Sequence, residues 1–412
     1  MPELFNVVTA AEAREMLARF INLERRSETV PLTGALGRCL AVPVRAFEDV
    51  PGFDRSTVDG YAVRASCTFG ASEGLPAYLE VTGEFSVEQC PDVSVGPGQA
   101  VRVATGGMLP AGADAVVMVE YTEELDGRTI GVVRPVAPGE NVVRRGEDFK
   151  TGEEILPAGR CLRPQDLGIL AAAGVERVEV SLPPRAGIIS TGDELVEPGQ
   201  KPGPGRVRDI NSYTLYGAVA SLGWEPRLYG IVRDDCGELL SVLQKALAEN
   251  DAVLLSGGSS VGVRDMTSRA IEGLGGPGVL FHGLAIKPGK PAVGAVVGGK
   301  PVFGLPGHPA SALVVFEAVA APVMRRVLAG GAKDELPAYP LRAVCTRSLR
   351  SAAGREDFVR VKLFWQDGAL FAEPVLGKSG LISTLVKANG LARIPPEKEG
   401  ISAGEMIEVR FI

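Results

Sequence analysis

Acidic side chains follow three apolar segments in the second half of the chain. The segments Arg185–Ser190, Arg227–Val232 and Asp251–Leu255 are typical of strands buried on both faces of a parallel sheet. Because the loops after such strands share one edge of a doubly wound sheet, we expect the carboxylates that follow them to converge. These are Asp193, Glu194, Asp234, Asp235 and Asp265. Converging carboxylates favour Mg²⁺ held against a phosphoryl or pyrophosphoryl ligand, although each could instead cap a helix.

The loop after Asp251–Leu255 consists of small residues, Ser256-Gly257-Gly258-Ser259-Ser260. Glycines let backbone N–H groups approach an anion closely, and a helical pattern begins soon after the loop. Strand, loop and helix start therefore predict an anion cradle with Asp265 at its rim. A tight turn without a ligand is an equally good interpretation of this loop taken alone.

Two cations stand on a stiff loop further along, Lys287-Pro288-Gly289-Lys290-Pro291. Lysine ammonium groups suit a phosphate or another oxyanion, and we expect this loop at the same edge of the sheet. Carboxylates for a metal and lysines for an anion in one pocket favour a catalytic site over a purely structural one.

The first half of the chain holds three polar stretches with less specific signals. Asp54–Tyr61 sets charged and polar groups beside an aromatic ring, and Val103–Gly107 ends a predicted strand in a Gly pair. Both could be capped turns. Arg144–Asp148 mixes two guanidinium groups with two carboxylates, which is more often a solvated turn than a site.

The elements that must position these residues predict a multidomain α/β and β fold. Alternating strand and helix patterns over 183–331 predict a doubly wound α/β domain with mostly parallel strands. Short β runs over 46–145, with a hairpin signal at Asp126-Gly127, predict an inserted β-rich domain. The β patterning of 332–412 predicts a small C-terminal β-barrel domain.

The remaining segments, 1–45 and 146–182, are expected to form one small discontinuous domain. A capping box at Thr9–Glu12 opens a helix, and a second helix covers Pro164–Ala173 with proline at its first position. We expect the two helices to pack together in this N-terminal dimerisation domain.

Composition narrows the classes of function. The formal charge of -7 disfavours a nucleic-acid binder with a general basic surface. Two histidines and six cysteines without a CxxC pair indicate neither a zinc site nor a disulfide framework. The first residues show no basic n-region followed by an apolar h-region, so nothing suggests export, and Glu317 interrupts the best candidate for a membrane span, Pro309–Met324. We therefore expect a cytoplasmic protein that does not enter a membrane.

Taken together, the motifs resemble the MoeA/gephyrin E-domain family, the molybdopterin molybdenumtransferases. The similarity runs through the whole chain in order, and the ordered set is specific although no single piece is. The matching stretches are 58–62 (VDGYA), 104–106 (ATG), 145–148 (RGED), 190–195 (STGDEL), 233–235 (RDD), 256–258 (SGG), 260–262 (SVG), Asp265, 285–291 (AIKPGKP) and 305–307 (LPG).

The resemblance implies an L-shaped homodimer of four-domain subunits, in which one domain resembles the molybdopterin adenylyltransferase fold. It implies that adenylylated molybdopterin and molybdate are converted to molybdenum cofactor and AMP. The active cleft would be shared, with the β-rich domain of one subunit facing the α/β domain of the other. A molybdopterin adenylyltransferase is the expected upstream partner.

The resemblance also implies roles for individual residues. The matching functional positions are Asp59, Thr105, Asp148, Glu194, Asp234, Asp265, Pro306 and Pro309. Mg²⁺ is expected on Glu194, Asp234 and Asp265, although the sequence leaves open which carboxylate serves metal, water or pterin. The substrates are expected at Ser256, Gly257, Gly258, Ser260, Lys287 and Lys290, with the lysines holding molybdate or phosphate.

One departure from the family pattern concerns His308, which stands where relatives often carry asparagine. Both side chains can donate a hydrogen bond, so we expect activity to persist, and histidine could make this step sensitive to pH. Three alternatives remain: a tungsten-inserting homologue, a non-catalytic gephyrin-like scaffold, and a nucleotide pyrophosphatase that shares only the α/β domain.

Overall fold

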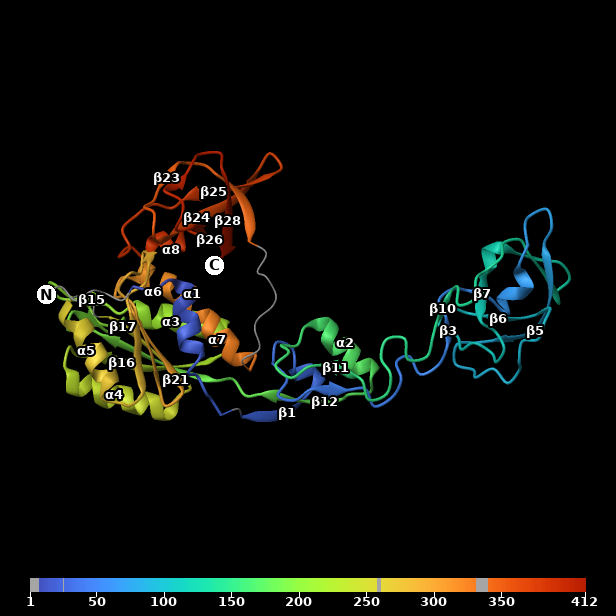
Figure 1. Ribbon diagram of the computed structural model, residues 1–412, viewed down its shortest axis with the longest axis horizontal. Helices are drawn as coiled ribbons and strands as arrows, with labels where there is room; N and C mark the ends of the chain where they lie inside the picture. Colours follow the sequence, from blue (N-terminus) through green and yellow to red (C-terminus); the bar gives the residue numbers. More distant parts are fainter. Residues whose placement is uncertain (1–6, 25, 258–260, 331–339) are drawn as a thin grey trace. The chain divides into compact units, whose positions relative to one another are not determined.

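The computed structural model describes residues 7–24, 26–257, 261–330 and 340–412, with the backbone alone for 261–265. The chain forms two compact units (Figure 1). The α/β unit comprises Met1–Glu28, Gly37–Cys39 and Ser181–Ile412, and the β-rich unit comprises Thr29–Leu36 and Leu40–Val180. Within the described ranges, no helix is long and apolar enough to cross a membrane.

A six-stranded sheet organises the α/β unit, in the order β16-β13-β17-β21-β20-β18. The first four strands are parallel, and the last two pair antiparallel at one edge. The strands are β13 (Arg185–Thr191), β16 (Glu225–Val232), β17 (Ala252–Gly257), β18 (Pro277–His282), β20 (Val293–Val297) and β21 (Lys300–Leu305). The predicted doubly wound α/β domain is confirmed.

Helices cover both faces of this sheet because successive strand residues point to opposite sides. Ile188 and Leu254 belong to one buried cluster, whereas Ile189 and Leu255 belong to the other. Figure 1 shows α4 and α5 on one side of the sheet and α1, α3, α6 and α7 on the other. The helices are α1 (Ala10–Ala18), α3 (Asn211–Ser221), α4 (Cys236–Glu249), α5 (Val261–Glu272), α6 (Pro309–Val315) and α7 (Ala321–Leu328).

The helical segment after β21 widens just before Pro322. A π-helical turn, Phe316–Ala320, separates α6 from α7. Proline lacks an N–H, and its ring clashes with the carbonyl four residues earlier, which is that of Ala318. Arg14 of α1 donates a hydrogen bond to this carbonyl at 3.0 Å. The guanidinium group thus satisfies the acceptor that the proline leaves without a helical partner.

Helix α1 does not pack where the sequence predicted. Its Thr9 capping box forms as expected, but Ala10, Ala13 and Leu17 are buried in the core of the α/β unit. Helix α2 (Pro164–Ala172) packs instead through Leu170 into a core of the β-rich unit. The expected contact between these two helices is therefore wrong, because the apolar face of α1 is covered by the sheet and its helices.

The C-terminal segment forms a closed barrel around its own core, as predicted. Five strands close through pairing of β24 with β26: β22 (Leu341–Cys345), β24 (Glu356–Gln366), β25 (Ala369–Pro374), β26 (Gly390–Ile394) and β28 (Met406–Phe411). A tight turn at Asp367 and Gly368, both with positive φ, joins β24 to β25. Two smaller strands, β23 (Leu349–Arg350) and β27 (Gly400–Ile401), pair beside it.

A second six-stranded sheet, in the order β7-β4-β6-β5-β9-β8, forms most of the β-rich unit. Its strands are β4 (Gly60–Val63), β5 (Ala77–Phe85), β6 (Gln99–Val103), β7 (Ala115–Met118), β8 (Thr122–Glu124) and β9 (Thr129–Val132). Apolar residues on its two faces form separate clusters. The Asp126-Gly127 turn joins β8 to β9, as expected from the sequence.

A further core of the β-rich unit surrounds helix α2. Short strands contribute to it or pair nearby: β1 (Ser27–Pro31), β2 (Val44–Arg45), β11 (Glu154–Leu156) and β12 (Arg177–Ser181). Cys39 and Cys161 are disulfide-bonded, contrary to the expectation that no disulfide forms. Next to the two cysteines, the Leu40 N–H donates to the Arg160 carbonyl at 2.9 Å. The two segments lie far apart in the sequence, so the sequence gave no indication that these cysteines pair.

Candidate functional site

The loops that follow the central parallel strands leave the sheet at one edge. Thr191 pairs with Gly257 across β13 and β17, and Ser256 pairs with Leu305 across β17 and β21. The end of β16 lies beside them, since Thr191 also pairs with Val232. The expected convergence of the strand-end loops is therefore confirmed.

Gly257 begins the predicted anion cradle and occupies a position that only glycine fits. Its φ is +145°, and a Cβ atom there would lie 2.2 Å from the carbonyl oxygen of Thr191. The absence of a side chain thus lets two strand ends approach closely. Of the other predicted cradle residues, Ser256 is buried in β17, whereas Gly258 and Ser260 lie outside the described residues.

Acidic groups from two of the loops gather at the same edge. The Asp234 backbone N–H donates to Asp193 Oδ1 at 3.3 Å. Burial raises the pKa of Asp234, and the negative charges of Asp193 and Glu194 raise it further. The structure therefore brings Glu194 and Asp234, two of the predicted metal ligands, into electrostatic contact.

The third predicted ligand, Asp265, belongs to helix α5, and its side chain lies outside the described residues. Among the side chains that are described, no three His, Cys, Asp or Glu residues form a metal-binding group. Asp235 has a structural role, because its carboxylate accepts the Glu238 N–H at 2.8 Å and caps α4. For this one residue, the helix-cap interpretation holds.

A cavity of about 490 Å³ lies beside the predicted oxyanion loop. Short strand β19 (Ile286–Lys287) pairs with the start of β24, so the loop is attached to the C-terminal barrel. Pro306 also lines the cavity. It is the first residue after β21, so the cavity begins next to the end of this strand. Its polar lining consists of Lys287, Lys290, His308, Ser311, Arg355 and Ser379. We call this cavity the oxyanion pocket.

Two of these polar residues come from the barrel and were missed in the sequence. Ser379 Oγ lies 3.1 Å from His308 Nδ1, and Arg355 Nε donates to the buried Asp357 at 2.9 Å. Both follow glycines in loops, Gly354-Arg355 and Gly377-Lys378-Ser379. Such patterns are common in ordinary turns, so the sequence does not distinguish these two residues from other polar residues in surface turns.

The two predicted prolines have different positions in the loop after β21. Pro306 lines the oxyanion pocket, whereas Pro309 is buried as the first residue of α6, where its missing N–H costs no hydrogen bond. His308 stands between Gly307 and α6 as the residue preceding the helix. The loop thus carries the His308 side chain from the end of β21 to the oxyanion pocket, which it lines.

Asp59 and Thr105 form a close pair in the β-rich unit. The backbone N–H of Thr105 donates to Asp59 Oδ1 at 2.7 Å, and its hydroxyl donates to the same oxygen at 2.9 Å. These two bonds lower the pKa of Asp59, the backbone bond contributing most. Asp148 is exposed in another turn of this unit, where its backbone N–H donates to Val50.

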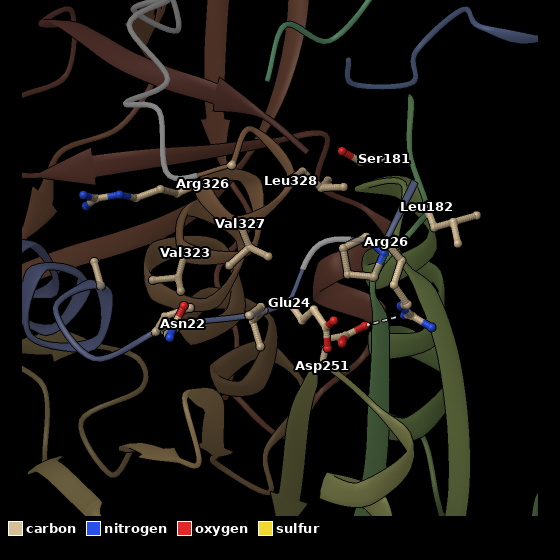
Figure 2. A pocket seen from close by; sticks show the side chains of 15 residues that line it. Asn22, Glu24, Arg26, Ser181, Leu182, Asp251, Val323, Arg326, Val327 and Leu328 are labelled. Atoms are coloured by element: carbon tan, nitrogen blue, oxygen red, sulfur yellow. Dashed lines mark hydrogen bonds and ion pairs between the residues drawn. The ribbon is translucent and has the colours of Figure 1, made fainter. Parts of the chain in front are cut away.

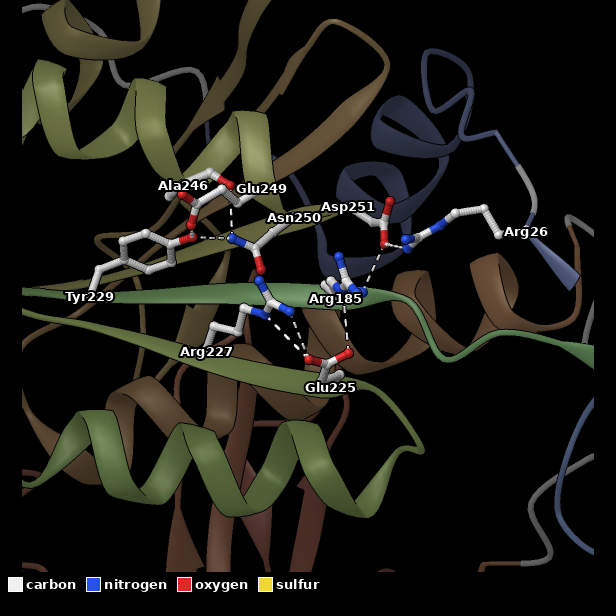
Figure 3. A network of polar contacts seen from close by, with 9 residues as sticks. All are labelled: Arg26, Arg185, Glu225, Arg227, Tyr229, Ala246, Glu249, Asn250 and Asp251. Atoms are coloured by element: carbon white, nitrogen blue, oxygen red, sulfur yellow. Dashed lines mark hydrogen bonds and ion pairs between the residues drawn. The ribbon is translucent and has the colours of Figure 1, made fainter. Parts of the chain in front are cut away.

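A second cavity, of about 290 Å³, lies at the opposite ends of the strands (Figure 2). Pro184 and Asp251, which line it, precede β13 and β17 rather than follow them. Asp251 accepts hydrogen bonds from the Arg185 backbone (2.8 Å) and from Arg26 (3.2 Å). Figure 3 shows that this ion-pair network ties together the strand beginnings. None of the predicted site residues that the structure describes lines this cavity.

Comparison with known proteins places the whole chain in one family. The MoeA N-terminal region (domain I and II) matches residues 8–174, the probable molybdopterin binding domain matches 187–326, and the MoeA C-terminal region (domain IV) matches 342–412. Together these models span nearly the full length of the sequence.

Individual relatives and solved structures agree with these matches. A putative molybdopterin biosynthesis protein of Methanocaldococcus jannaschii is 37% identical, with 97% of this chain and 95% of that protein covered. The molybdopterin molybdenumtransferase of Bacillus subtilis is 33% identical, with 97% and 93% covered. A MoeA crystal structure from Pyrococcus horikoshii OT3 superposes with a TM-score of 0.83 at 34% identity, with 99% and 100% covered. This chain belongs to the MoeA family.

Proposed function

We propose that this chain is a molybdopterin molybdenumtransferase, which inserts molybdenum into molybdopterin during molybdenum cofactor biosynthesis. The observation that carries the proposal is the oxyanion pocket, whose lining includes Pro306, the residue directly after β21, the strand that pairs with the cradle strand β17. Relatives of B. subtilis and Mycobacterium tuberculosis bear this name and align over nearly all of their length.

Molybdate is the substrate that suits the oxyanion pocket. It is a tetrahedral dianion, and Lys287, Lys290 and Arg355 supply cationic groups around the cavity. The Ser379 hydroxyl adds a neutral polar group to the same lining, held by its contact with His308. Among the described lining residues there are three cations and no acidic side chain, which favours an anion over a neutral ligand.

The second substrate is proposed to be adenylylated molybdopterin, with its phosphoanhydride at the cradle that begins at Ser256 and Gly257. Because Gly257 has no side chain, its backbone approaches Thr191 closely and no Cβ atom covers this strand end. Helix α5 begins directly after the loop, so its N-terminal amides suit a phosphate. Hydrolysis of the phosphoanhydride would release AMP and leave the molybdopterin phosphate, while the dithiolene sulfurs would replace oxygen ligands of the molybdate in the oxyanion pocket, which leave as water.

The carboxylates at the sheet edge suit Mg²⁺. Burial raises the pKa of Asp234, and the negative charges of Asp193 and Glu194 raise it further, so a divalent cation would relieve the repulsion among these carboxylates. We propose that Glu194, Asp234 and Asp265 hold the ion. When bound, it supplies positive charge that neutralises the phosphoanhydride. Asp193 stays hydrogen-bonded to the Asp234 backbone and orients that loop.

A homodimer with a shared cleft is proposed from the family resemblance. Asp59 and Thr105 of one subunit would then face the α/β unit of the other, with Asp148 as a further contributor. A molybdopterin adenylyltransferase would supply the adenylylated substrate. The four-domain division, with boundaries at 1–45 with 146–182, 46–145, 183–331 and 332–412, stays a prediction, although helix α1 of the first segment packs in the α/β unit. The cytoplasmic location is also a prediction.

The function is tested by incubating the full chain with adenylylated molybdopterin, Mg²⁺ and molybdate. We expect AMP release and formation of molybdenum cofactor, both dependent on molybdate. Tungstate in place of molybdate tests the tungsten alternative, which a clear preference for tungstate would favour. Absence of AMP release with either oxyanion would contradict the proposal and favour a scaffold.

The shared cleft has its own test. Asp59→Ala and Asp265→Ala should each abolish or strongly impair turnover while leaving the circular dichroism spectrum unchanged. If each active cleft takes one residue from each subunit, mixing the two inactive variants should restore part of the activity. Failure of the mixture to regain any activity, with subunit exchange verified, would refute the shared cleft.

A further inference from the structure

One side-chain amide connects the two loops that hold the proposed reactants. Asn211 is the first residue of α3, and its Nδ2 donates to Ser256 Oγ at 2.7 Å and to the Gly307 carbonyl at 2.8 Å. Ser256 precedes Gly257 at the start of the cradle, and Gly307 precedes His308 of the oxyanion pocket. Each N–H of one planar amide therefore holds one loop.

The hydrogen bond from Asn211 to Ser256 is buried, and the one to the Gly307 carbonyl is partly buried. Asn211 is 7% exposed and Ser256 is 1% exposed. Hydrogen bonds between buried groups are stronger than in water, and removal of one partner leaves the other unsatisfied, which is costly. The separation of the two loops is thus held by bonds that solvent cannot readily replace.

The identity of the side chain matters for this bridge. The Gly307 carbonyl can only accept a hydrogen bond, so the nitrogen of the Asn211 amide must face it. With aspartate at this position, a carboxylate oxygen would face the carbonyl oxygen, and neither could donate. Within the part of the chain that the structure describes, no group donates to the buried Asn211 Oδ1. The neighbouring buried polar network is separate, since Ser190 Oγ and the Ser212 N–H both bond Asp209 Oδ1.

We propose that Asn211 is a positioning residue that sets the separation between the adenylate cradle and the oxyanion pocket. This role rests on the proposed function, because it concerns the alignment of adenylylated molybdopterin with molybdate. Each loop can bind its own ligand without the bridge, whereas transfer needs both reactants in register. A displacement of about 1 Å between reacting groups can lower a rate on the order of a hundredfold.

The chain contains a matched control in Asn250 (Figure 3). Its Nδ2 also makes two hydrogen bonds, to the Tyr229 hydroxyl at 2.6 Å and to the Ala246 carbonyl at 2.8 Å. Asn250 is 2% exposed, and its Oδ1 likewise has no donor in the described regions. It lies two residues before β17, at the opposite end of that strand from Ser256.

The experiment compares Asn211→Ala with Asn250→Ala in the full chain. We expect Asn211→Ala to lower kcat at least about tenfold, with the KM for molybdate and the Kd for AMP within about threefold of wild type. Asn250→Ala should lower the melting temperature by a similar amount and leave kcat within about twofold. Hydrogen exchange should rise in peptides covering 252–257 and 305–309 only in the Asn211 variant.

Three results would overturn the proposal: a wild-type kcat in Asn211→Ala, an equal loss of kcat in both variants, or unchanged exchange in both loops. Should Asn211→Ala not fold, Asn211→Ser keeps a short polar group in the site and is judged by the same criteria. Wild-type protein that releases no AMP would refute the proposed function instead, while hydrogen exchange would still decide whether Asn211 couples the loops.

Discussion

His308 and Ser379 join the loop after β21 to the C-terminal barrel. His308 Nδ1 lies 3.1 Å from Ser379 Oγ, and the Ser379 carbonyl accepts the Ala310 backbone N–H at 3.1 Å. Two bonds thus connect one short loop of the barrel to the start of α6. The oxyanion pocket therefore depends on the docking of the barrel onto the α/β sheet.

Replacement of His308 by asparagine should be tolerated. The Asn amide can make a hydrogen bond with Ser379 as the imidazole does, so we expect turnover within a few-fold of wild type at neutral pH. The measurement is AMP release at saturating molybdate. The control is His308→Phe, which removes the hydrogen bond and should raise the molybdate KM. A large loss of turnover in His308→Asn would show that histidine has a role that asparagine cannot fill.

Removal of the Arg355 guanidinium should weaken molybdate binding. Arg355 lines the oxyanion pocket and is oriented by the buried Asp357. We expect Arg355→Ala to raise the molybdate KM at least about tenfold, or about 1.4 kcal/mol, with a smaller change in kcat. Arg393→Ala is the matched control, because Arg393 is an ion-paired barrel arginine that does not line this pocket. Equal effects in the two variants would argue against an anion at Arg355.

Asp234→Asn should stabilise the fold and impair the reaction. Burial and nearby carboxylates raise the pKa of Asp234 above its usual value of 3.8, which means that the folded state disfavours the charged form. The protein therefore loses folding stability as the pH rises and this carboxyl group ionises. The variant should melt at a higher temperature than wild type near about pH 7, and the difference should vanish near about pH 3. Mg²⁺ should stabilise the wild type more than the variant. A lower melting temperature in Asp234→Asn would contradict this account.

Gly257→Ala should disrupt the cradle through steric overlap. The new Cβ would lie 2.2 Å from the Thr191 carbonyl oxygen, in a backbone conformation with φ of +145°. We expect a loss of at least about 3 kcal/mol in unfolding free energy by urea denaturation. Gly223→Ala is the control, since Gly223 also has positive φ but no atom within 4 Å of its Cβ position, and it should cost only about 1 kcal/mol. Similar losses in both variants would mean that contact with Thr191 is unimportant.

The sequence carried the signals that depend on neighbours along the chain. Buried strands of the α/β sheet, the Thr9 capping box, the turn at Asp126-Gly127 and the barrel hairpin at Gly368 all follow from local periodicity and turn chemistry. The rule that parallel strands end at one edge then located the cradle, the lysine loop and the carboxylates. The strands, the capping box and the turns formed as predicted because each needs only a few consecutive residues, whereas the roles of the cradle, the lysines and the carboxylates stay predictions.

The tertiary structure decided what depends on contacts between distant segments. The burial of α1 in the α/β core, the disulfide at Cys39 and Cys161, and the entry of Arg355 and Ser379 into the oxyanion pocket have no local signature. The same holds for Asn211, whose two bonds reach residues 45 and 96 positions away. Side-chain periodicity shows which face of an element is buried, but which distant partner covers it is set by packing of the whole chain.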